Sequence, residues 1–435
     1  MLLVFTPSST PRLRFIFDFI FRDILGMPYM LTHDKAHFRS SSLPKLHYGE
    51  SPLDTEPFIY SSRLLFEKGI SDQEITVFEW EDCKAFFATH PKYLFPFDPF
   101  AASFYLISRY EEYLPHKRDL YNRFEASQSL AYEKGFLHKP VVDIWAMKLR
   151  DVLLRIYPSL EFTDRRYKYI STVDIDNAFA YREKGLFRTA GAYLRALFAL
   201  DFKEISKRFA VLFRMEKDPY DTYDDLLGLQ TRYSFQSIYF FLLGDYGEND
   251  KNVPHFSKRL QTLIKSIADY SDTGIHPSFN SNAAPDKLIT EISRLRKILK
   301  RDVKKSRQHF LILNFPSTYR RLIDQDITDD YTMGYAAQVG FRAGTCTPFY
   351  FYDLDLETET RLRVHSFAAM DATLRYYLKI NPSQAIHVVE PLIDEVKKVN
   401  GTFISLWHNE SLSDKSPWEG WQGVYEQVIQ KALVS

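Results

Sequence analysis

The sequence contains little cysteine and no excess of charge of either sign. Its only two cysteines among 435 residues, Cys83 and Cys346, exclude a disulfide framework and a cysteine-rich zinc site. Any metal ion must therefore be held by histidine and carboxylate side chains. Lysine plus arginine and aspartate plus glutamate number 56 each, so the net charge is zero. This balance gives no electrostatic indication that nucleic acid or an anionic membrane is a partner.

Long apolar runs and targeting signals are also missing. The first residues form a five-residue apolar run without a basic start or a small-residue cleavage site, unlike a signal peptide. Segment 12–25 is apolar, but Arg14, Asp18 and Arg22 recur at helical spacing, which indicates an amphipathic helix and not a membrane span. We find no repeat or low-complexity tract. These features predict a protein without a membrane span that is located in the cytoplasm; its oligomeric state stays open.

Aromatic residues are abundant, in contrast. They make up 16% of the chain, with 36 Phe and 28 Tyr, and the hydrophobic content of 45% is typical of a globular protein. Large cores account for most of these rings, although flat aromatic faces can also stack on sugar rings.

The first third of the chain predicts a small mixed α/β domain over residues 1–165. We expect strands at 2–5, 46–48 and 75–78, and helices at 11–25, 100–113 and 140–157. Asp98 followed by Pro99 is a typical helix start. The aromatic and charged segment 108–114 is typical of a domain interface, and Pro158 with the charged run 164–166 marks the boundary.

Residues 166–435 alternate short apolar runs with amphipathic segments. We expect strands at 168–173, 237–243, 272–276, 308–313, 339–342 and 402–407, and helices at 255–269, 286–300, 316–325, 361–379 and 383–399. This alternation predicts a parallel sheet or barrel, in which ligands bind at the carboxyl ends of the strands. Segment 180–225 reads as a long helical insertion, either a lid or a packing arm.

The most informative motif is Tyr-Ile-Ser-Thr-Val-Asp-Ile-Asp-Asn at 169–177. It reads as an apolar strand that ends in Asp174 and Asp176, whose two-residue spacing directs both carboxylates to one side. Such a pair can place one acid on a metal ion and keep the other beside it as a base. The alternative is a simple turn at a strand end. The motifs at 274–280, 306–310 and 406–410 favour the metal site, because they add His276, His309 and His408 at or near predicted strand ends.

Residues 168–415 resemble the polysaccharide deacetylases of the NodB-homology type, which remove acetyl groups from N-acetylated sugars. The family's five motifs resemble, in the same order, residues 172–177, 276–280, 307–310, 330–335 and 406–408. Residues 340–345 also resemble a variant of this family. The first 160 residues look like a domain of unknown function that accompanies some bacterial members. The resemblance implies a distorted, incomplete (β/α) barrel of about seven strands and a carbohydrate substrate.

The resemblance also implies roles for individual side chains. Asp176 and His276 would bind a divalent metal ion, with Zn²⁺ favoured by this mixture of carboxylate and imidazole. Asp174 would be the base, and Arg307 would hold it ionised through a bidentate bond. His408 would protonate the leaving amine.

Two further assignments concern the partner of His408 and the third metal ligand. Asp330 is the candidate to orient His408. The family pattern His-x-x-x-His has Asn280 at its second position, so the third metal ligand is either Asn280 or His309, with His309 slightly preferred because imidazole binds zinc better than an amide oxygen.

Three functions agree with these residues. The first is a metal-dependent hydrolase of C–N bonds other than peptide bonds, which deacetylates an N-acetylated sugar of a cell-envelope glycan or its precursor. The second is an inactive carbohydrate-binding relic of the same fold, which Asn280 would explain. The third is an amidohydrolase that acts on a non-sugar amide. Trp407, Trp418 and Trp421 could stack on a sugar or only pack the structure.

Overall fold

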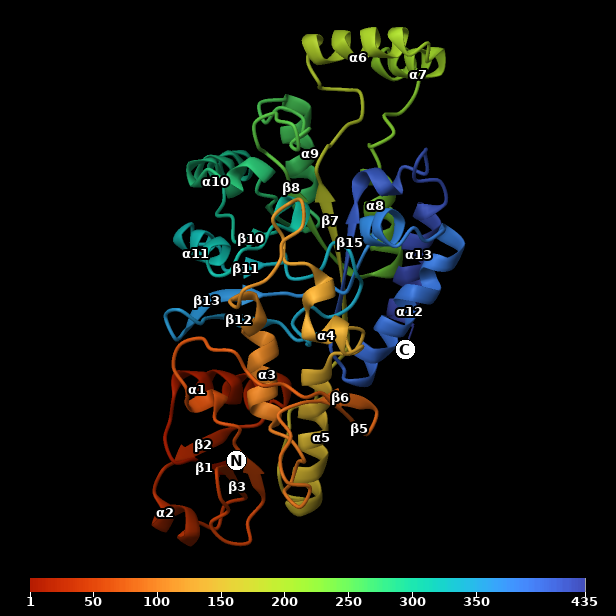
Figure 1. Cartoon of the computed structure of the whole chain (residues 1–435). Helices are drawn as coiled ribbons and strands as arrows, with labels where there is room; N and C mark the ends of the chain where they lie inside the picture. The colour runs from red at the N-terminus through yellow and green to blue at the C-terminus, as the bar shows by residue number, and fades with distance from the viewer. Residues whose placement is uncertain (435) are drawn as a thin grey trace.

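A nine-stranded sheet occupies the larger part of the chain in the computed structural model, which describes residues 1–434 (Figure 1). Its strand order is β12-β13-β11-β10-β9-β8-β7-β15-β14. The strands are β7 (Lys168–Ile175), β8 (Gln236–Phe241), β9 (Asp272–Ile275), β10 (Lys305–Ser306), β11 (Asp329–Asp330), β12 (Phe349–Asp353), β13 (Thr358–Val364), β14 (Ala369–Met370) and β15 (Thr402–His408). All neighbours are parallel except β12 and β13.

Helices connect most of these parallel strands, as the alternating sequence predicts. They are α8 (Tyr223–Tyr233), α9 (Lys258–Ala268), α10 (Pro285–Leu299), α11 (Ser317–Asp324) and α12 (Pro382–Lys398), and α13 (Trp421–Leu433) follows β15. The α/β class and the parallel sheet are therefore confirmed. The sheet has nine strands and not about seven, and within residues 1–434 its edge strands β12 and β14 do not pair to close a barrel.

Three predicted elements of this part are wrong. Segment 308–313 is a 3₁₀ turn and not a strand, because Phe310 and Leu311 adopt positive φ angles of 59° and 55°. Segment 339–342 is a loop in which Gly340 has a φ of 122°. Segment 361–379 is helical only near its end, where Thr373–Tyr377 form a π-helical turn. Before it, Leu362 and Val364 alternate with exposed residues, which is the pattern of strand β13, and the short strand β14 follows.

The N-terminal part contains a parallel sheet of order β2-β1-β3-β4. Its strands are β1 (Leu2–Phe5), β2 (Tyr29–Thr32), β3 (Lys45–Gly49) and β4 (Phe58–Tyr60), and a separate hairpin pairs β5 (Phe78–Trp80) with β6 (Cys83–Ala85). The helices are α1 (Pro11–Phe17), which continues as a π-helical turn to Ile24, α2 (Lys35–Ser40), α3 (Pro99–Ile107), α4 (Leu130–Glu133) and α5 (Val141–Ile156). The expected strand at 75–78 is displaced to 78–80.

The start of α3 follows the prediction. The Asp98 carboxylate accepts the backbone N–H groups of Phe100 and Ala101 at 3.1 and 3.0 Å, with Pro99 at the first helical position. This arrangement satisfies N–H groups that a helix otherwise leaves without partners.

The N-terminal and C-terminal parts share one apolar core, which contains residues from Leu2 to Ala432. A buried ionic cluster also joins them: Glu112 contacts Arg109 at 2.8 Å and Arg342 at 2.6 Å. Segment 108–114 therefore contacts the C-terminal part of the chain. The division into domains at 165/166 stays a prediction.

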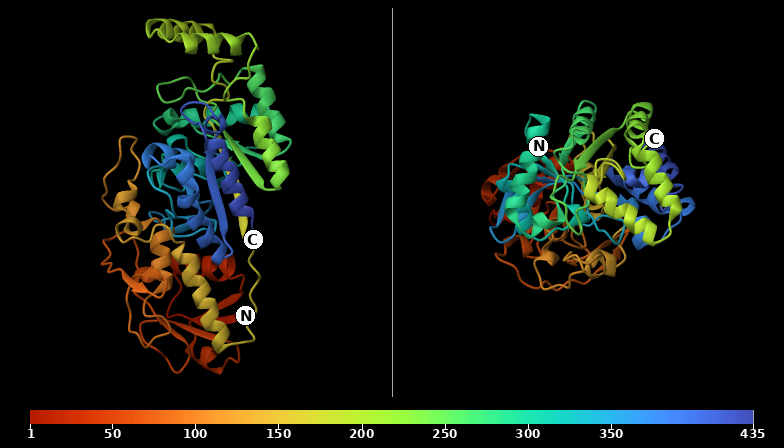
Figure 2. Two further views of the ribbon diagram at one scale, coloured as in Figure 1. Left: turned by 90° about the vertical axis from the view of Figure 1, so that its right-hand side faces the viewer. Right: turned by 90° about the horizontal axis from the view of Figure 1, so that it is seen from above.

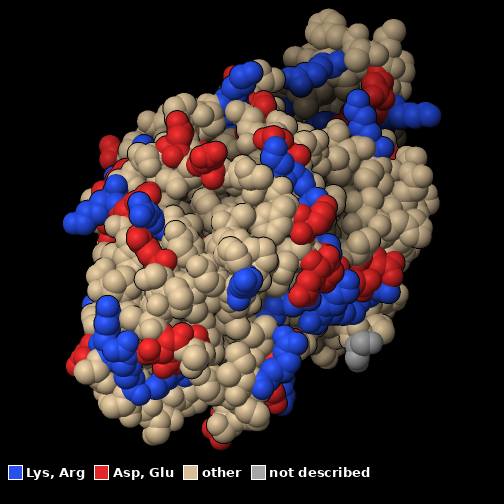
Figure 3. All heavy atoms as spheres, turned by 60° about the horizontal axis from the view of Figure 1, so that its bottom comes forward, with Lys and Arg blue, Asp and Glu red and all other residues tan. Residues whose placement is uncertain are grey.

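Two helices stand apart from the body. Helices α6 (Leu186–Phe198) and α7 (Phe202–Leu212) form a hairpin between β7 and α8 that projects beyond the sheet (Figures 1 and 2). Among residues 1–434, no helix has the length and apolar character needed to cross a membrane. On the face in Figure 3, basic and acidic side chains are interspersed and do not gather into one large patch.

Candidate metal centre and cavity

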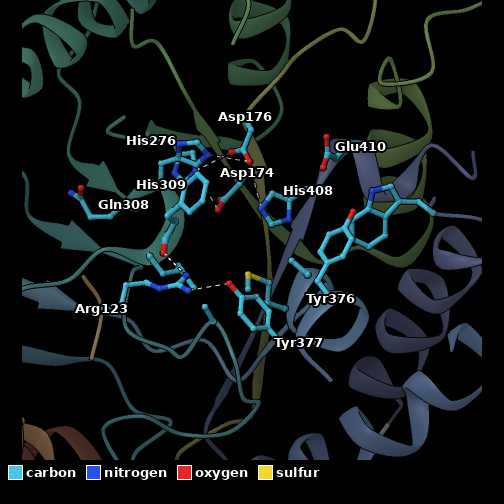
Figure 4. A pocket seen from close by; sticks show the side chains of 16 residues that line it. Arg123, Asp174, Asp176, His276, Gln308, His309, Tyr376, Tyr377, His408 and Glu410 are labelled. Atoms are coloured by element: carbon cyan, nitrogen blue, oxygen red, sulfur yellow. Dashed lines mark hydrogen bonds and ion pairs between the residues drawn. The ribbon is translucent and has the colours of Figure 1, made fainter. Parts of the chain in front are cut away.

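The predicted functional side chains meet at the carboxyl ends of β7, β9, β10 and β15. Asp176 directly follows β7, His276 follows β9, His309 lies in the turn after β10, and His408 is the last residue of β15. These strands run parallel in one sheet, in which β8 separates β9 from β7, so their carboxyl ends lie along one edge (Figure 4). The strand-end rule therefore explains why residues more than 200 positions apart lie together.

Asp176, His276 and His309 form a compact cluster of possible metal ligands. One ligand atom from each lies within 4.8 Å of the others. The Nε2 atom of His276 is 3.0 Å from Oδ1 of Asp176, and the Nε2 atom of His309 is 3.4 Å from Oδ2. Two ligands about 2.1 Å from a tetrahedral zinc ion would lie roughly 3.4 Å apart. The spacing of these atoms therefore suits a shared divalent ion.

The hydrogen bonds of the Nδ1 atoms of His276 and His309 show that the Nε2 atoms face this centre. Nδ1 of His276 donates to the carbonyl oxygen of Arg307 at 2.5 Å, and Nδ1 of His309 donates to Oδ1 of Asp250 at 3.0 Å. When the rings are neutral, the Nε2 lone pairs are thus free to bind a metal, which is the usual support of histidine ligands. Oδ1 of Asp176 is buried and accepts no hydrogen bond within the described chain, although His276 Nε2 is close. These three side chains therefore fit a metal ion with an open fourth position.

The charges in this cluster are strongly coupled. Burial opposes protonation of His309, but the carboxylates of Asp176 and Asp250 outweigh it and raise the pKa of His309 to about 9. Burial likewise opposes ionisation of Asp176, but the His309 charge and the closeness of both imidazole rings hold its pKa well below the usual range. A metal ion that binds here must displace the proton of His309, so binding releases a proton.

Asp174 lies beside the cluster and is nearly fully buried. Its Oδ2 atom is 3.7 Å from Nε2 of His276, and its Oδ1 atom accepts a hydrogen bond from Arg307 at 3.1 Å. Arg307 also donates to Thr172 Oγ1 at 2.7 Å and to the Tyr331 carbonyl at 3.0 Å. The predicted pairing of Arg307 with Asp174 is present, but it is formed by one nitrogen and is not bidentate.

The partner of His408 differs from the prediction. Nδ1 of His408 contacts Oδ1 of Asp371 at 2.8 Å, and its backbone N–H donates to Oδ2 at 2.8 Å. Asp330 instead accepts hydrogen bonds from Ser306 and Thr332 at 2.7 and 2.9 Å. The reason is sheet order: β14, which ends next to Asp371, pairs with β15, whereas β11 lies on the far side of β10.

Asp371 makes His408 suitable as a proton donor. Burial opposes the charged imidazolium, but the carboxylate of Asp371 outweighs it and raises the pKa of His408 well above its ordinary value. The Nε2 atom of His408 is 3.8 Å from Oδ2 of Asp176, so the proton of the His408 imidazolium lies next to the cluster of possible metal ligands.

The other candidate for the third ligand lies elsewhere. Asn280 lies in the 3₁₀ turn Phe279–Asn282, where its side chain packs against Gly247 and its backbone N–H donates to Asp250 at 3.2 Å. Asn280 does not line the cavity, whereas His309 does. The structure thus groups His309 and not Asn280 with Asp176 and His276, and the ligand roles themselves stay predictions.

A cavity of about 300 Å³ opens onto this centre. Its walls include Asp174, Asp176 and the three histidines on one side and Tyr376 and Tyr377 on another (Figure 4). Trp418 also lines the cavity. This volume is at the small end for ligand pockets. Trp407 and Trp421 are buried and do not line the cavity, so among the three tryptophans considered only Trp418 can contact a ligand there.

Two cavity residues had no role in the sequence-based prediction. Arg123, from the N-terminal part, donates to the Phe310 carbonyl at 2.9 Å and to the Tyr377 hydroxyl at 3.0 Å. Glu410 lies two residues after His408 and lines the same cavity, and burial raises its pKa. Only the position of Glu410 in the 406–410 motif could have indicated it; no local signal identifies Arg123.

Comparison with protein families gives one match, to a family of unknown function (DUF7033) over residues 2–158. No curated protein matches the sequence significantly. The chain is similar to a Mycobacterium smegmatis protein assigned to the polysaccharide deacetylases, at 13% identity and a TM-score of 0.40, covering 63% of this chain and 87% of that one.

Two further solved structures are similar over the same extent. A polysaccharide deacetylase from Bacillus cereus has 10% identity and a TM-score of 0.31, with 62% and 86% of the two chains covered. A CE4 family pseudoenzyme from Bacillus anthracis has 10% identity and a TM-score of 0.29, with 62% and 66% covered. Similarity at this level determines neither the fold nor the activity of this chain.

Proposed function

We propose that the protein is a metal-dependent hydrolase that removes the acetyl group from an N-acetylated sugar of a cell-envelope glycan or its precursor. The observation that supports this most directly is the placement of Asp174 and His408 on the ligand cluster. Asp174 approaches His276 to 3.7 Å, and His408 approaches Asp176 to 3.8 Å. A base and an acid therefore border one metal centre, as amide hydrolysis requires.

A divalent ion held by Asp176, His276 and His309 would acidify water and polarise the acetamido carbonyl. Asp174 takes the proton of the attacking water, and the buried guanidinium of Arg307 orients its carboxylate through a hydrogen bond of 3.1 Å. The water oxygen bonds to the acyl carbon, the C–N bond breaks, and His408 gives its proton to the departing amine. The products are acetate and the free amino sugar.

The groups that line the cavity support a sugar as the substrate. Tyr376 is half exposed and meets the buried ring of Trp418 edge to face, with ring centroids 5.1 Å apart and planes at 75°, so the two rings give the cavity an aromatic surface that a pyranose ring can contact. Arg123 and the Tyr377 hydroxyl add polar groups that can bind hydroxyl oxygens. These contacts are what a carbohydrate needs: one apolar face and several hydrogen bonds at the rim.

The test is to load purified full-length protein with Zn²⁺, measure its metal content, and assay acetate release from N-acetylglucosamine oligomers and from nucleotide-linked N-acetylated sugars. Stoichiometric metal with acetate release supports the proposal. Stoichiometric metal with hydrolysis of non-sugar amides only would favour the general amidohydrolase. A protein that binds sugars but neither holds metal nor releases acetate is the binding relic.

A further inference from the structure

The α6–α7 hairpin leaves its largest apolar side chains in solvent. Of the 24 large hydrophobic residues that are exposed in residues 1–434, ten lie between positions 186 and 215. Phe187 is 96% exposed and Phe198 is 85% exposed. Each helix of the hairpin buries only one residue, Ala196 in α6 and Val211 in α7. Exposed apolar surface gathered in this way marks an interaction site more often than a defect.

The exposed residues form a stripe on each helix. Phe187, Leu194 and Phe198 follow one another at spacings of seven and four, which places them on one face of α6. Phe202 and Phe209 in α7, with Phe213 directly after its last residue, repeat the same spacing. The hairpin, which projects from the body of the protein in Figure 2, thus carries exposed aromatic and aliphatic side chains along both of its helices.

The hairpin is also basic, although the whole chain is neutral. Residues 186–215 contain six lysines and arginines and only two acids, Asp201 and Glu204. Arg195, Lys203, Lys207 and Arg214 form no ion pair with any side chain in residues 1–434, so their charges are available to a partner. The zero net charge of the sequence conceals this local excess.

Phenylalanine and leucine on one face combined with unpaired basic residues are typical of helices that lie in the interface of an anionic bilayer. Association with a second hairpin of the same chain would bring two basic surfaces together, which is electrostatically unfavourable. The charge therefore favours a lipid surface over a second copy.

The hairpin is firmly attached to the body. Arg188 donates to the carbonyl oxygens of Lys251 and Asn252 at 2.9 and 3.0 Å, and its guanidinium lies 4.1 Å from the ring centre of Tyr246. The Asp218 carboxylate accepts the backbone N–H groups of residues 180–182. These contacts hold the two ends of the hairpin together, so a partner bound to it is held in a fixed orientation.

The base of the hairpin is continuous with the catalytic edge of the sheet. The side-chain amide of Asn409 donates to the carbonyl oxygens of Asn177 and Tyr220, at 3.1 and 3.0 Å. Asn177 directly follows Asp176, Asn409 directly follows His408, and strand β7 points toward the hairpin (Figure 1). A surface that the hairpin binds is therefore on the same side as the cavity.

We propose that the α6–α7 hairpin binds the surface of an anionic lipid bilayer, with its phenylalanine and leucine rows among the lipid headgroups and acyl chains. The protein then acts as a peripheral membrane protein that spans no bilayer. This proposal does not depend on the hydrolysis proposed above, since it rests on residues outside the metal centre.

The test is sedimentation of the full-length protein with vesicles of phosphatidylcholine alone or mixed with phosphatidylglycerol. We expect binding to the mixed vesicles and at least tenfold weaker binding to phosphatidylcholine. The triple variant Phe187→Ser/Phe198→Ser/Phe202→Ser should lose binding at least tenfold. The matched control Leu120→Ser/Leu356→Ser changes exposed apolar residues outside the hairpin and should bind like the unaltered protein. Because all five side chains are exposed, we expect unchanged melting temperatures, and measuring them verifies that the variants fold.

Two results would overturn the proposal. One is equal vesicle binding by the triple variant, by the control and by the unaltered protein, or no binding by any of them. The other is a stable dimer in sedimentation velocity that the triple variant converts to monomer while vesicles are not bound; the hairpin would then be a subunit interface. Acetate release is not used in either measurement, so an inactive metal centre would leave the outcome unaffected.

Discussion

Replacing Asp371 by asparagine tests which carboxylate supports His408. The structure gives Asp371, whereas the sequence predicts Asp330. The carboxylate accepts two hydrogen bonds from His408, both at 2.8 Å, and the side chain is fully buried. Asparagine has nearly the same shape and can still accept the backbone N–H, but its amide nitrogen can only donate to Nδ1. It therefore removes the charge that keeps His408 protonated.

The expected loss is that of a general acid. Without the carboxylate, the pKa of His408 falls, and a neutral imidazole is a far weaker proton donor. Turnover should drop about 10²- to 10³-fold, equivalent to about 3–4 kcal/mol of barrier. Metal content should stay normal, because Asp371 is not in the cluster of Asp176, His276 and His309.

The pH profile gives a second readout with a defined sign. Because Asp371 raises the pKa of His408 above its ordinary value, the protonated form persists at neutral pH and is lost as the pH rises through the folded-state pKa. The alkaline limb of turnover should therefore move to lower pH in the Asp371→Asn variant.

Asp330→Asn is the matched control. Asp330 is equally buried, and burial raises its pKa, so an uncharged amide is compatible with its surroundings. Its partners are Ser306 and Thr332, and the substitution should leave the alkaline limb in place. If Asp330→Asn moved that limb and Asp371→Asn did not, or if Asp371→Asn stripped the metal, the assignment of Asp371 to His408 would be refuted.

Three further predictions concern the metal centre. His309→Ala should remove bound Zn²⁺ as measured by mass spectrometry, whereas Asn280→Ala should keep it; the reverse result would make Asn280 the ligand. Asp174→Asn should retain metal but lose turnover about 10²- to 10⁴-fold, while Asp176→Asn should lose metal, and equal retention by both variants would contradict the division of roles. Because the metal-free His309 has a pKa of about 9, zinc affinity should fall about tenfold per pH unit below that value, with proton release visible in calorimetry in buffers of different ionisation enthalpy. An affinity independent of pH between 6 and 8 would show that the ion does not displace the proton of His309.

The sequence predicts those parts of the structure that carry a strong local pattern. Strands β7 and β15 are continuous apolar runs, and both were located to within one or two residues. Asp174 and Asp176 could be placed because a strand that ends in two acids specifies their direction. The rule that parallel strands expose their carboxyl ends at one edge then groups His276 and His408 with them.

The parts that failed depend on contacts far apart in the chain. His309 was placed in a strand beside Arg307, but it reaches the centre through a turn in which Phe310 has a positive φ. Asp371 was missed because β14 has only two residues and gives no periodic signal. Thus the sequence indicates which side chains can bind metal, whereas the sheet order determines which carboxylate supports which histidine.

Arg123 has a consequence for how this chain could be divided or recombined. Because it lines the cavity and donates hydrogen bonds to both the Phe310 carbonyl and the Tyr377 hydroxyl, the first third of the protein builds part of the cavity wall. A fragment that begins near residue 166 would lack this wall and expose the apolar surface that now packs against it. Conversely, changes confined to the N-terminal third would alter the shape of the cavity, and under the proposed function its choice of substrate, while every residue of the ligand cluster stays the same. Selectivity and chemistry would then be able to evolve on separate stretches of one chain.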